Sequence, residues 1–446
     1  MPRRTLIAFL LLTGLTSNLA GQSRAREPQL RGTRQSTDSL IAADSKSLAL
    51  QPTNNRLAAK LALDYIQKMR ETVNFDYLNL AARLVDGVLD RDPGNYEALR
   101  LRSEVEMERH HFALVAEYSI EMARFSPNDP GAWGSLGDSS MELGQYDRAG
   151  QAYQKMLALR PDLTSYNRLA WYRFVTGDSA GAIALMQAAI RAGNAAPENV
   201  AWCWAELGRM YWKIGRSDDA LNAYHSALSN FPNYYAAWAG IGLIASAQDQ
   251  VKDAISAYLK AQATVPMPEY AEALEDLYQR SGNPAAAKQQ HDLIDAIEIT
   301  MRASGEKTNR NMALLYANQN RNLDRAAELV ENEINLRPDV YTHDALAWVL
   351  FRQGKLSEAR KASEVALSRR TPEPMFHFHA AMIDQALGQR DEAAHQFSQA
   401  LALNPEWDFH QSALARQAEQ ILQPTTSFTS PSHVNKLESN LKGPKE

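Results

Sequence analysis

Cysteine is almost absent from this chain of 446 residues, which contains one, Cys203. A single thiol cannot form an intramolecular disulfide, so the fold must be stabilised by packing alone. Cys203 lies between Trp202 and Trp204 in an apolar segment. We therefore expect a small buried side chain there and not a reactive thiol.

A long apolar segment and a strong excess of one charge are also lacking. The apolar run at residues 6–12 follows Arg3 and Arg4 and is shorter than the roughly 20 apolar residues of a membrane-spanning helix. This pattern is typical of a signal peptide, so residues 1–20 are predicted to be a cleaved leader of an exported, periplasmic or secreted protein with no stable membrane insertion. A net charge of −5 without a basic stripe argues against nucleic acid as a partner.

Catalytic and cofactor signatures are missing as well. The chain has no G-x-S-x-G elbow, Walker loop, His-Glu-x-x-His motif or glycine-rich dinucleotide turn, so we predict neither an enzyme nor a cofactor. Histidines do gather toward the end of the chain, but His377 and His379 are two residues apart. A helix would point them about 200° apart, so we predict no metal site.

A repeated pattern is what the sequence does contain. Residues 129–161, 201–232 and 235–266 share a Trp, then Leu or Ile followed by Gly, then Ala, an aromatic residue and a closing Pro. The shared residues are Trp133, Leu136, Gly137, Ala149, Tyr153 and Pro161; Trp204, Leu207, Gly208, Ala220, Tyr224 and Pro232; and Trp238, Ile241, Gly242, Ala254, Tyr258 and Pro266.

The small residue of this pattern recurs ten times between residues 56 and 408, at intervals of 33 to 39 residues. One occurrence, Val115, is not small, and the two longest intervals indicate insertions at residues 193–197 and within 285–302. The ten positions are Ala81, Val115, Ala149, Ala182, Ala220, Ala254, Ala287, Ala326, Ala359 and Ala393.

These residues resemble the tetratricopeptide repeat, a unit of about 34 residues with two antiparallel helices. The resemblance implies an all-α, right-handed α-solenoid of about ten helix-turn-helix repeats over residues 56–408. We expect a C-terminal capping helix at 409–422, since the end of such an array needs a polar outer face. Polar composition predicts disorder at 21–55 and 423–446.

The resemblance also implies a binding surface, because the first helix of each repeat lines the concave groove in this family. Positions 2, 5, 9, 12 and 13 of that helix commonly contact the ligand, and the constant spacing of eight residues from Leu to turn Gly sets the register. The candidates are Asn167, Trp171 and Phe174 in the fourth repeat; Trp202, Arg209 and Trp212 in the fifth; and Asp344, Trp348 and Phe351 in the ninth.

Each candidate also has a structural interpretation. Neighbouring first helices can bury these rings against one another, or a tightly wound superhelix can bring them together. The acidic residues Glu269, Glu272 and Asp276 lie on one helix face and are interpreted either as a surface for a basic partner or as a solvated face.

The predicted function is a non-enzymatic, exported interaction scaffold that binds a protein or peptide segment in its groove. One alternative is a structural component of an envelope assembly, such as polysaccharide export or outer-membrane biogenesis. Another is a glycan-binding or hydrolytic role of the groove aromatics.

Overall fold

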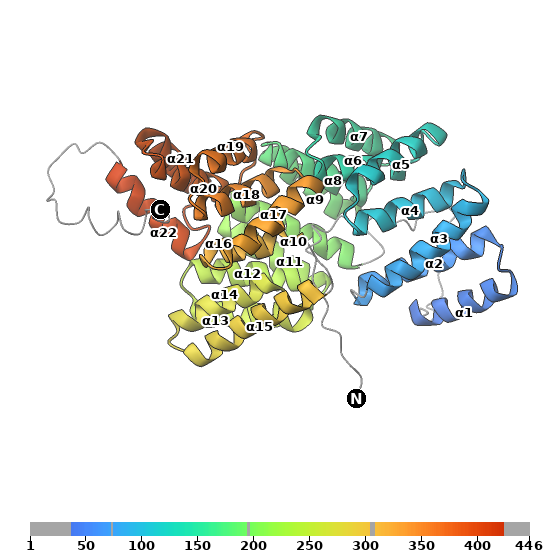
Figure 1. Cartoon of the computed structure of the whole chain (residues 1–446), viewed down its shortest axis with the longest axis horizontal. Helices are drawn as coiled ribbons and strands as arrows, with labels where there is room; N and C mark the ends of the chain where they lie inside the picture. Colours follow the sequence, from blue (N-terminus) through green and yellow to red (C-terminus); the bar gives the residue numbers. More distant parts are fainter. Residues whose placement is uncertain (1–36, 73–74, 194–196, 304–307, 423–446) are drawn as a thin grey trace. The chain divides into compact units, whose positions relative to one another are not determined.

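The computed structural model describes residues 37–72, 75–193, 197–303 and 308–422. These residues form 22 α-helices and no strand, and Figure 1 labels the helices along the chain. None of the described helices combines the length and apolar content needed to cross a bilayer. The predicted leader at 1–20 and the predicted tail at 423–446 lie outside the described residues.

The chain divides into two compact units, and the boundary between them follows Thr164. In the N-terminal unit α2 packs on α3, α4 on α5 and α6 on α7. Its helices are α1 (Thr37–Leu50), α2 (Asn55–Thr72), α3 (Phe75–Arg91), α4 (Tyr96–Glu108), α5 (Phe112–Phe125), α6 (Pro130–Glu142) and α7 (Tyr146–Leu159).

The C-terminal unit continues the same pairing, with α10 on α11 and so on to α20 on α21. Its helices are α8 (Leu163–Val175), α9 (Ser179–Ala192), α10 (Pro197–Lys213), α11 (Ser217–Asn230), α12 (Tyr235–Ala247), α13 (Val251–Thr264), α14 (Pro268–Arg280), α15 (Pro284–Ala303), α16 (Arg310–Asn318), α17 (Leu323–Leu336), α18 (Val340–Arg352), α19 (Leu356–Leu367), α20 (Pro374–Ala386), α21 (Arg390–Leu403) and α22 (Phe409–Leu422).

The ten repeats predicted from the sequence are confirmed. Each of the ten pattern residues from Ala81 to Ala393 lies in the second helix of a pair, α3 to α21, and none is more than 4% exposed. Even Val115 is fully buried. The small residues have this position because neighbouring helices approach closely there.

A residue in the left-handed backbone conformation lies in the turn between the two helices of each repeat, from the second repeat to the tenth. Its φ lies between 52° and 89° at His110, Gly144, Gly177, Gly215, Asp249, Gly282, Asn320, Gly354 and Gly388. Glycine adopts this conformation without steric cost, and Asn, Asp and His do so more readily than other residues. A search for glycine therefore finds most of these turns and misses those at 110, 249 and 320.

The expectation of disorder at 21–55 is wrong for residues 37–50, which form α1. This helix is held to α2 by ion pairs, with Lys60 Nζ 2.8 Å from Asp44 Oδ1 and Lys68 Nζ 2.8 Å from Asp38 Oδ1. Leu48 also packs against the buried hydrophobic residues of α2, α3 and α4. A prediction from composition did not identify α1, because polar side chains make most of the contacts that hold this helix.

A helix does occur at the predicted C-terminal cap, where α22 packs against α21. Its buried residues are Ser412, Ala415 and Ala418. Small side chains on this face let the two helices approach closely, as they do within the repeats.

Glycine and tyrosine set the spacing of the central repeats. The ring of Tyr224 lies against Gly208 of its own repeat and Gly240 of the next, and a Cβ added at Gly208 would be 2.8 Å from Tyr224 Cε1. Tyr258 packs in the same way against Gly242. The Leu-Gly and Ala-x3-Tyr parts of the sequence pattern therefore form a single contact.

We predict that Gly208→Ala lowers the free energy of unfolding by about 1–3 kcal/mol, because the tyrosine ring must shift to admit the methyl group. In Gly87→Ala the new Cβ has its nearest neighbour at 3.6 Å, the flexible end of Arg91. This control should gain about 0.5–1 kcal/mol from helix propensity. Urea denaturation of both variants provides the measurement, and equal effects at the two sites would contradict the proposed contact.

Candidate functional site: first-helix residues of the C-terminal unit

Within the C-terminal unit, early and late repeats are in direct contact. The Thr371 hydroxyl donates a hydrogen bond to the Val175 carbonyl at 2.6 Å, across 196 residues of sequence. Asn404 Nδ2 donates to the Trp212 carbonyl at 2.7 Å, across 192 residues. The array therefore closes on itself, with the fourth and fifth repeats against segments that flank the tenth.

This closure buries Trp171 of α8. Its ring stacks on Tyr341 of α18 with centroids 6.0 Å apart, and the guanidinium carbon of Arg209 lies 4.4 Å from the Trp171 centroid. Lys213 of α10 forms an ion pair with Glu373, which precedes α20. Residues of the fourth, fifth, ninth and tenth repeats thus meet in one place.

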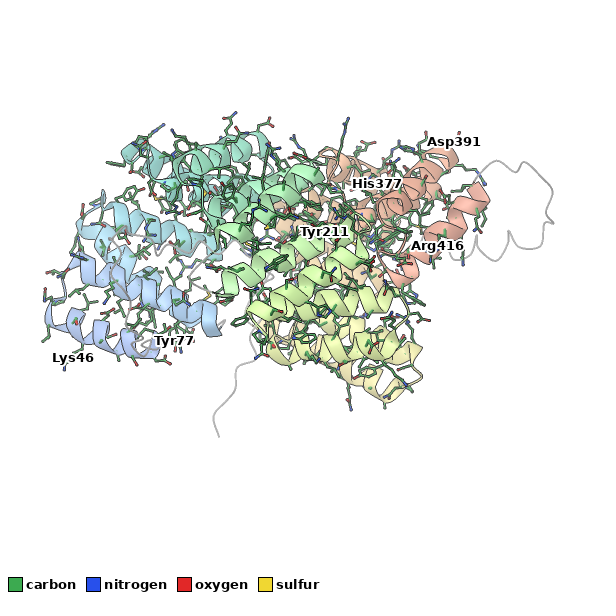
Figure 2. All side chains as sticks on the ribbon, turned by 180° about the vertical axis from the view of Figure 1, so that it is seen from behind. Lys46, Tyr77, Tyr211, His377, Asp391 and Arg416 are labelled. Atoms are coloured by element: carbon green, nitrogen blue, oxygen red, sulfur yellow. The ribbon has the colours of Figure 1, made fainter. Side chains whose placement is uncertain are left out.

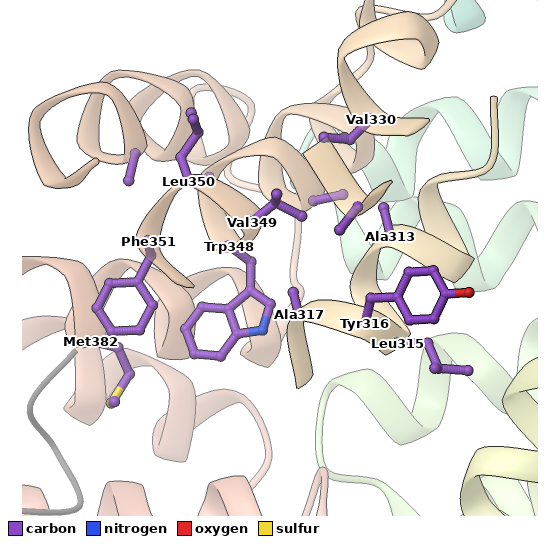
Figure 3. Close-up of a cluster of buried hydrophobic side chains, with 14 of the residues drawn as sticks. Ala313, Leu315, Tyr316, Ala317, Val330, Trp348, Val349, Leu350, Phe351 and Met382 are labelled. Atoms are coloured by element: carbon purple, nitrogen blue, oxygen red, sulfur yellow. The ribbon is translucent and has the colours of Figure 1, made fainter. Parts of the chain in front are cut away.

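Trp348 of α18 lies in a second buried cluster, which Figure 3 shows together with Phe351 and Met382. Its ring stacks on His379 with centroids 4.1 Å apart, and its Nε1 donates to Asn318 Oδ1 at 3.0 Å. His379 Nδ1 lies 3.0 Å from both carboxylate oxygens of Asp344. Trp348 Nε1 and His379 Nδ1 therefore each have a side-chain hydrogen-bond partner within the protein.

Most of the predicted groove residues are packing residues. Seven of the nine candidates are buried, as the packing alternative expects: Asn167, Trp171, Phe174, Trp212, Asp344, Trp348 and Phe351. The two interpretations based on packing and winding account for them, because neighbouring helices and the closure of the array cover their side chains. Trp202 and Arg209 are partly exposed, so their contact with a partner stays a prediction.

Tyr341 is a residue that the sequence interpretation missed. It occupies position 2 of the ninth repeat, in the register that placed Asp344 at position 5. Lys213 Nζ and Arg310 Cζ lie 6.0 Å and 5.6 Å from its ring centroid. The register was sufficient to find Tyr341, but its contact with the fourth repeat depends on the winding of the array.

The acidic face of α14 has a different environment from the tryptophan clusters. Glu269 and Glu272 are partly exposed overall, yet both carboxylate oxygens of Glu269 are shielded from solvent and accept no hydrogen bond. The side chain of Asn311 approaches Glu269 without hydrogen-bond geometry. Glu269 is therefore not part of an ordinary solvated surface.

Burial shifts the titration of both glutamates. It raises the pKa of Glu269 to about 7, and burial followed by the nearby charge of Glu269 raises the pKa of Glu272 to about 8. These shifts express the cost of holding two carboxylates at one place with little water. A cation bound here would relieve that cost.

Asp276, the third acidic residue of this face, already has partners. Its carboxylate is 2.7 Å from His410 Nε2 and 3.3 Å from Arg280 Nη1. Burial alone would raise the pKa of Asp276, but these two partners lower it overall. Only Glu269 and Glu272 are therefore left for an external ligand.

The other reactive side chains are placed as structural residues. No group of three or more His, Cys, Asp or Glu side chains in the described part of the chain is arranged to hold a metal ion. His377 Nδ1 lies 2.7 Å from Gln396 Oε1 and does not approach a common point with the Asp344-bound His379. Cys203 is buried, as predicted, and burial raises the pKa of its thiol to about 12.

Paired helices around a repeated left-handed turn define a helical-repeat solenoid. The model of the tetratricopeptide repeat matches residues 113–164, 135–197 and 205–266, which include the stretches 129–161 and 235–266 and all but the first four residues of 201–232. The chain therefore contains repeats of the tetratricopeptide family. Proteins of this family are generally non-enzymatic scaffolds that bind other proteins.

Solved structures with this architecture resemble the chain at low identity. A tetratricopeptide repeat protein from Parabacteroides merdae is 19% identical, with 59% of this chain and 99% of that chain covered and a TM-score of 0.33. A thermophilic protein of the same repeat type from Thermus thermophilus is 17% identical, with 44% and 99% covered and a TM-score of 0.36. Human IFIT1 as a dimer with PPP-AAAA is 14% identical, with 81% and 87% covered and a TM-score of 0.43. No curated protein matches the chain significantly.

The raised pKa values of Glu269 and Glu272 predict that stability falls as pH rises. The folded protein holds these protons more tightly than the unfolded chain, so their contribution is complete below the unfolded pKa of about 4.3 and is lost up to pH 8. Replacing both residues by Gln should remove on the order of 2 kcal/mol of this dependence between pH 5 and pH 8.

Urea denaturation at the two pH values measures this difference, with Glu331→Gln on an exposed side chain as the control. The double variant should be more stable than the unaltered protein at pH 8 and about equal to it at pH 5. The same pH dependence in all three proteins would show that the two glutamates are ordinary surface carboxylates.

Proposed function

We propose that this protein is a non-enzymatic scaffold that holds a basic protein or peptide segment against α14 and α16 of its seventh and eighth repeats. The observation that carries the proposal is the Glu269 carboxylate, which is shielded from solvent and accepts no hydrogen bond. A buried carboxylate without a partner is costly, and a charged N–H donor offsets that cost.

The position of this carboxylate also supports the proposal. Glu269 and Glu272 occupy positions 2 and 5 of the first helix of the seventh repeat, as counted from Leu274 and the turn residue Gly282. Asn311 and Asn318 of α16 lie beside them, so amide groups flank the two acids. This surface can accept hydrogen bonds from a lysine or arginine side chain and contact the adjoining peptide through the amides.

The proposed location of the protein is outside the cytoplasm, as an exported protein. This rests on the two arginines and the short apolar run of residues 1–20, which have the order of a leader. An exported chain with a single buried cysteine needs no disulfide formation to fold.

Fluorescence anisotropy with labelled short peptides tests the binding proposal. Peptides that contain lysine or arginine should bind, and the same peptides with alanine at those positions should not. Glu269→Gln/Glu272→Gln should weaken binding about tenfold or more, since a charge-assisted hydrogen bond contributes roughly 1.5–3 kcal/mol. Added salt should weaken binding further.

The control is Glu331→Gln, which removes one negative charge from an exposed position of α17. It should bind basic peptides as the unaltered protein does. Equal binding of basic and alanine peptides, or undiminished binding by the double variant, would contradict the proposal.

A further inference from the structure

A cavity of about 360 Å³ opens between α19, α20 and α21, at residues distinct from the acidic face of α14. Among its lining residues are Arg360, Ser363, Asp384 and His395. Asp391, at the start of α21, is labelled in Figure 2. A volume of this size is in the range of small-molecule sites.

The repeat register shows how this place differs from three other repeats. Asp384 lies four residues before the left-handed turn residue Gly388. The residues at that position in the fifth, seventh and eighth repeats are Tyr211, Tyr278 and Tyr316, each four residues before its own left-handed turn residue. The tenth repeat therefore has a short carboxylate where three other repeats have an aromatic ring.

Two largely buried residues on the cavity wall have polar side chains that make no hydrogen bond to the described residues. Asp384 is 8% exposed and makes no hydrogen bond through its carboxylate to the described residues; its nearest cationic atom is Arg360 Nη1 at 4.0 Å. Arg360 directs its own hydrogen bonds to Glu364 and Gln389. Ser363 is 5% exposed, and its hydroxyl likewise has no partner in the described part of the chain. Both side chains face the cavity because they line it.

The charge of the wall specifies the kind of ligand. Asp384, Glu364, Asp391 and Glu392 bring four negative charges to the cavity, and Arg360 brings one positive charge. No metal-binding group of His, Cys, Asp or Glu is formed by the described residues, so an inorganic cation is not the expected occupant. The oxygens of Asp384 and Ser363 can accept hydrogen bonds from N–H donors on a group of positive charge.

We propose that this cavity binds a small organic cation through an alkylammonium or guanidinium group that donates hydrogen bonds to Asp384 and Ser363. Free amines and the side chains of lysine or arginine in a peptide share this chemistry. Burial raises the pKa of Asp384, as is expected for a carboxylate that lacks a close cation.

Isothermal titration calorimetry of the full chain at low salt tests the proposal with three probes: cadaverine, agmatine and lysine blocked at both ends. We expect binding of at least one probe. If blocked lysine binds as well as cadaverine, the site accepts a side chain; if the free amines alone bind, the ligand is a small amine.

Asp384→Asn keeps the shape of the cavity and removes the charge, so it should weaken binding about tenfold or more. Asp384→Tyr places a ring where the fifth, seventh and eighth repeats have one and should abolish binding. Ser363→Ala provides a second variant if either change prevents folding, and it should weaken binding to a smaller extent. Glu358→Gln, on an exposed part of α19 away from the cavity, should leave affinity unchanged.

Circular dichroism confirms that each variant is folded before titration. The proposal is overturned if no probe binds the unaltered protein, or if the folded Asp384 variants bind as tightly as the Glu358→Gln control.

Discussion

The C-terminal unit depends on contacts between repeats that are far apart in sequence. The hydrogen bonds from Thr371 and Asn404 end on backbone carbonyls at the ends of the first helices of the fourth and fifth repeats. The Val175 carbonyl, at the end of α8, has no intrahelical partner, so Thr371 satisfies a group that would otherwise require water. The Trp212 carbonyl accepts the Gly215 N–H at 3.0 Å as well as the bond from Asn404. A linear array of repeats, in which each unit contacts only its neighbours, would not have these bonds.

The closure determines which first-helix residues a partner can reach. Trp171 is covered by Tyr341 of the ninth repeat and by Arg209, whereas Trp348 is covered by His379 of the adjacent repeat without any need of the closure. On α14 the partly exposed side chains of Glu269 and Glu272 are held without a cation. Trp171 and Trp348, although at groove positions, pack between helices of this unit. Glu269 and Glu272 are the groups that we propose for binding.

The fold could be predicted from local residues because each repeat makes its main contacts within about 34 residues. Gly208 and Tyr224, for example, follow directly from the sequence pattern. Non-glycine turns such as Asn320 and the polar helix α1 were missed, since neither has a strong local signal. For the candidate site, the sequence predicted the positions of the residues within each repeat but not whether their side chains are exposed. Whether Trp171 faces solvent depends on a helix about 170 residues later, and the winding that brings α18 there is the sum of small rotations at every repeat.

A double-mutant cycle on Trp171 and Tyr341 measures the closure most directly. Trp171→Leu, Tyr341→Leu and the double variant are compared with the unaltered protein by urea denaturation, and the coupling energy is the departure from additivity. Stacked rings in contact should give about 0.5–1.5 kcal/mol. A coupling energy of zero, with the two single effects strictly additive, would mean that the fourth and ninth repeats do not meet and would contradict the account.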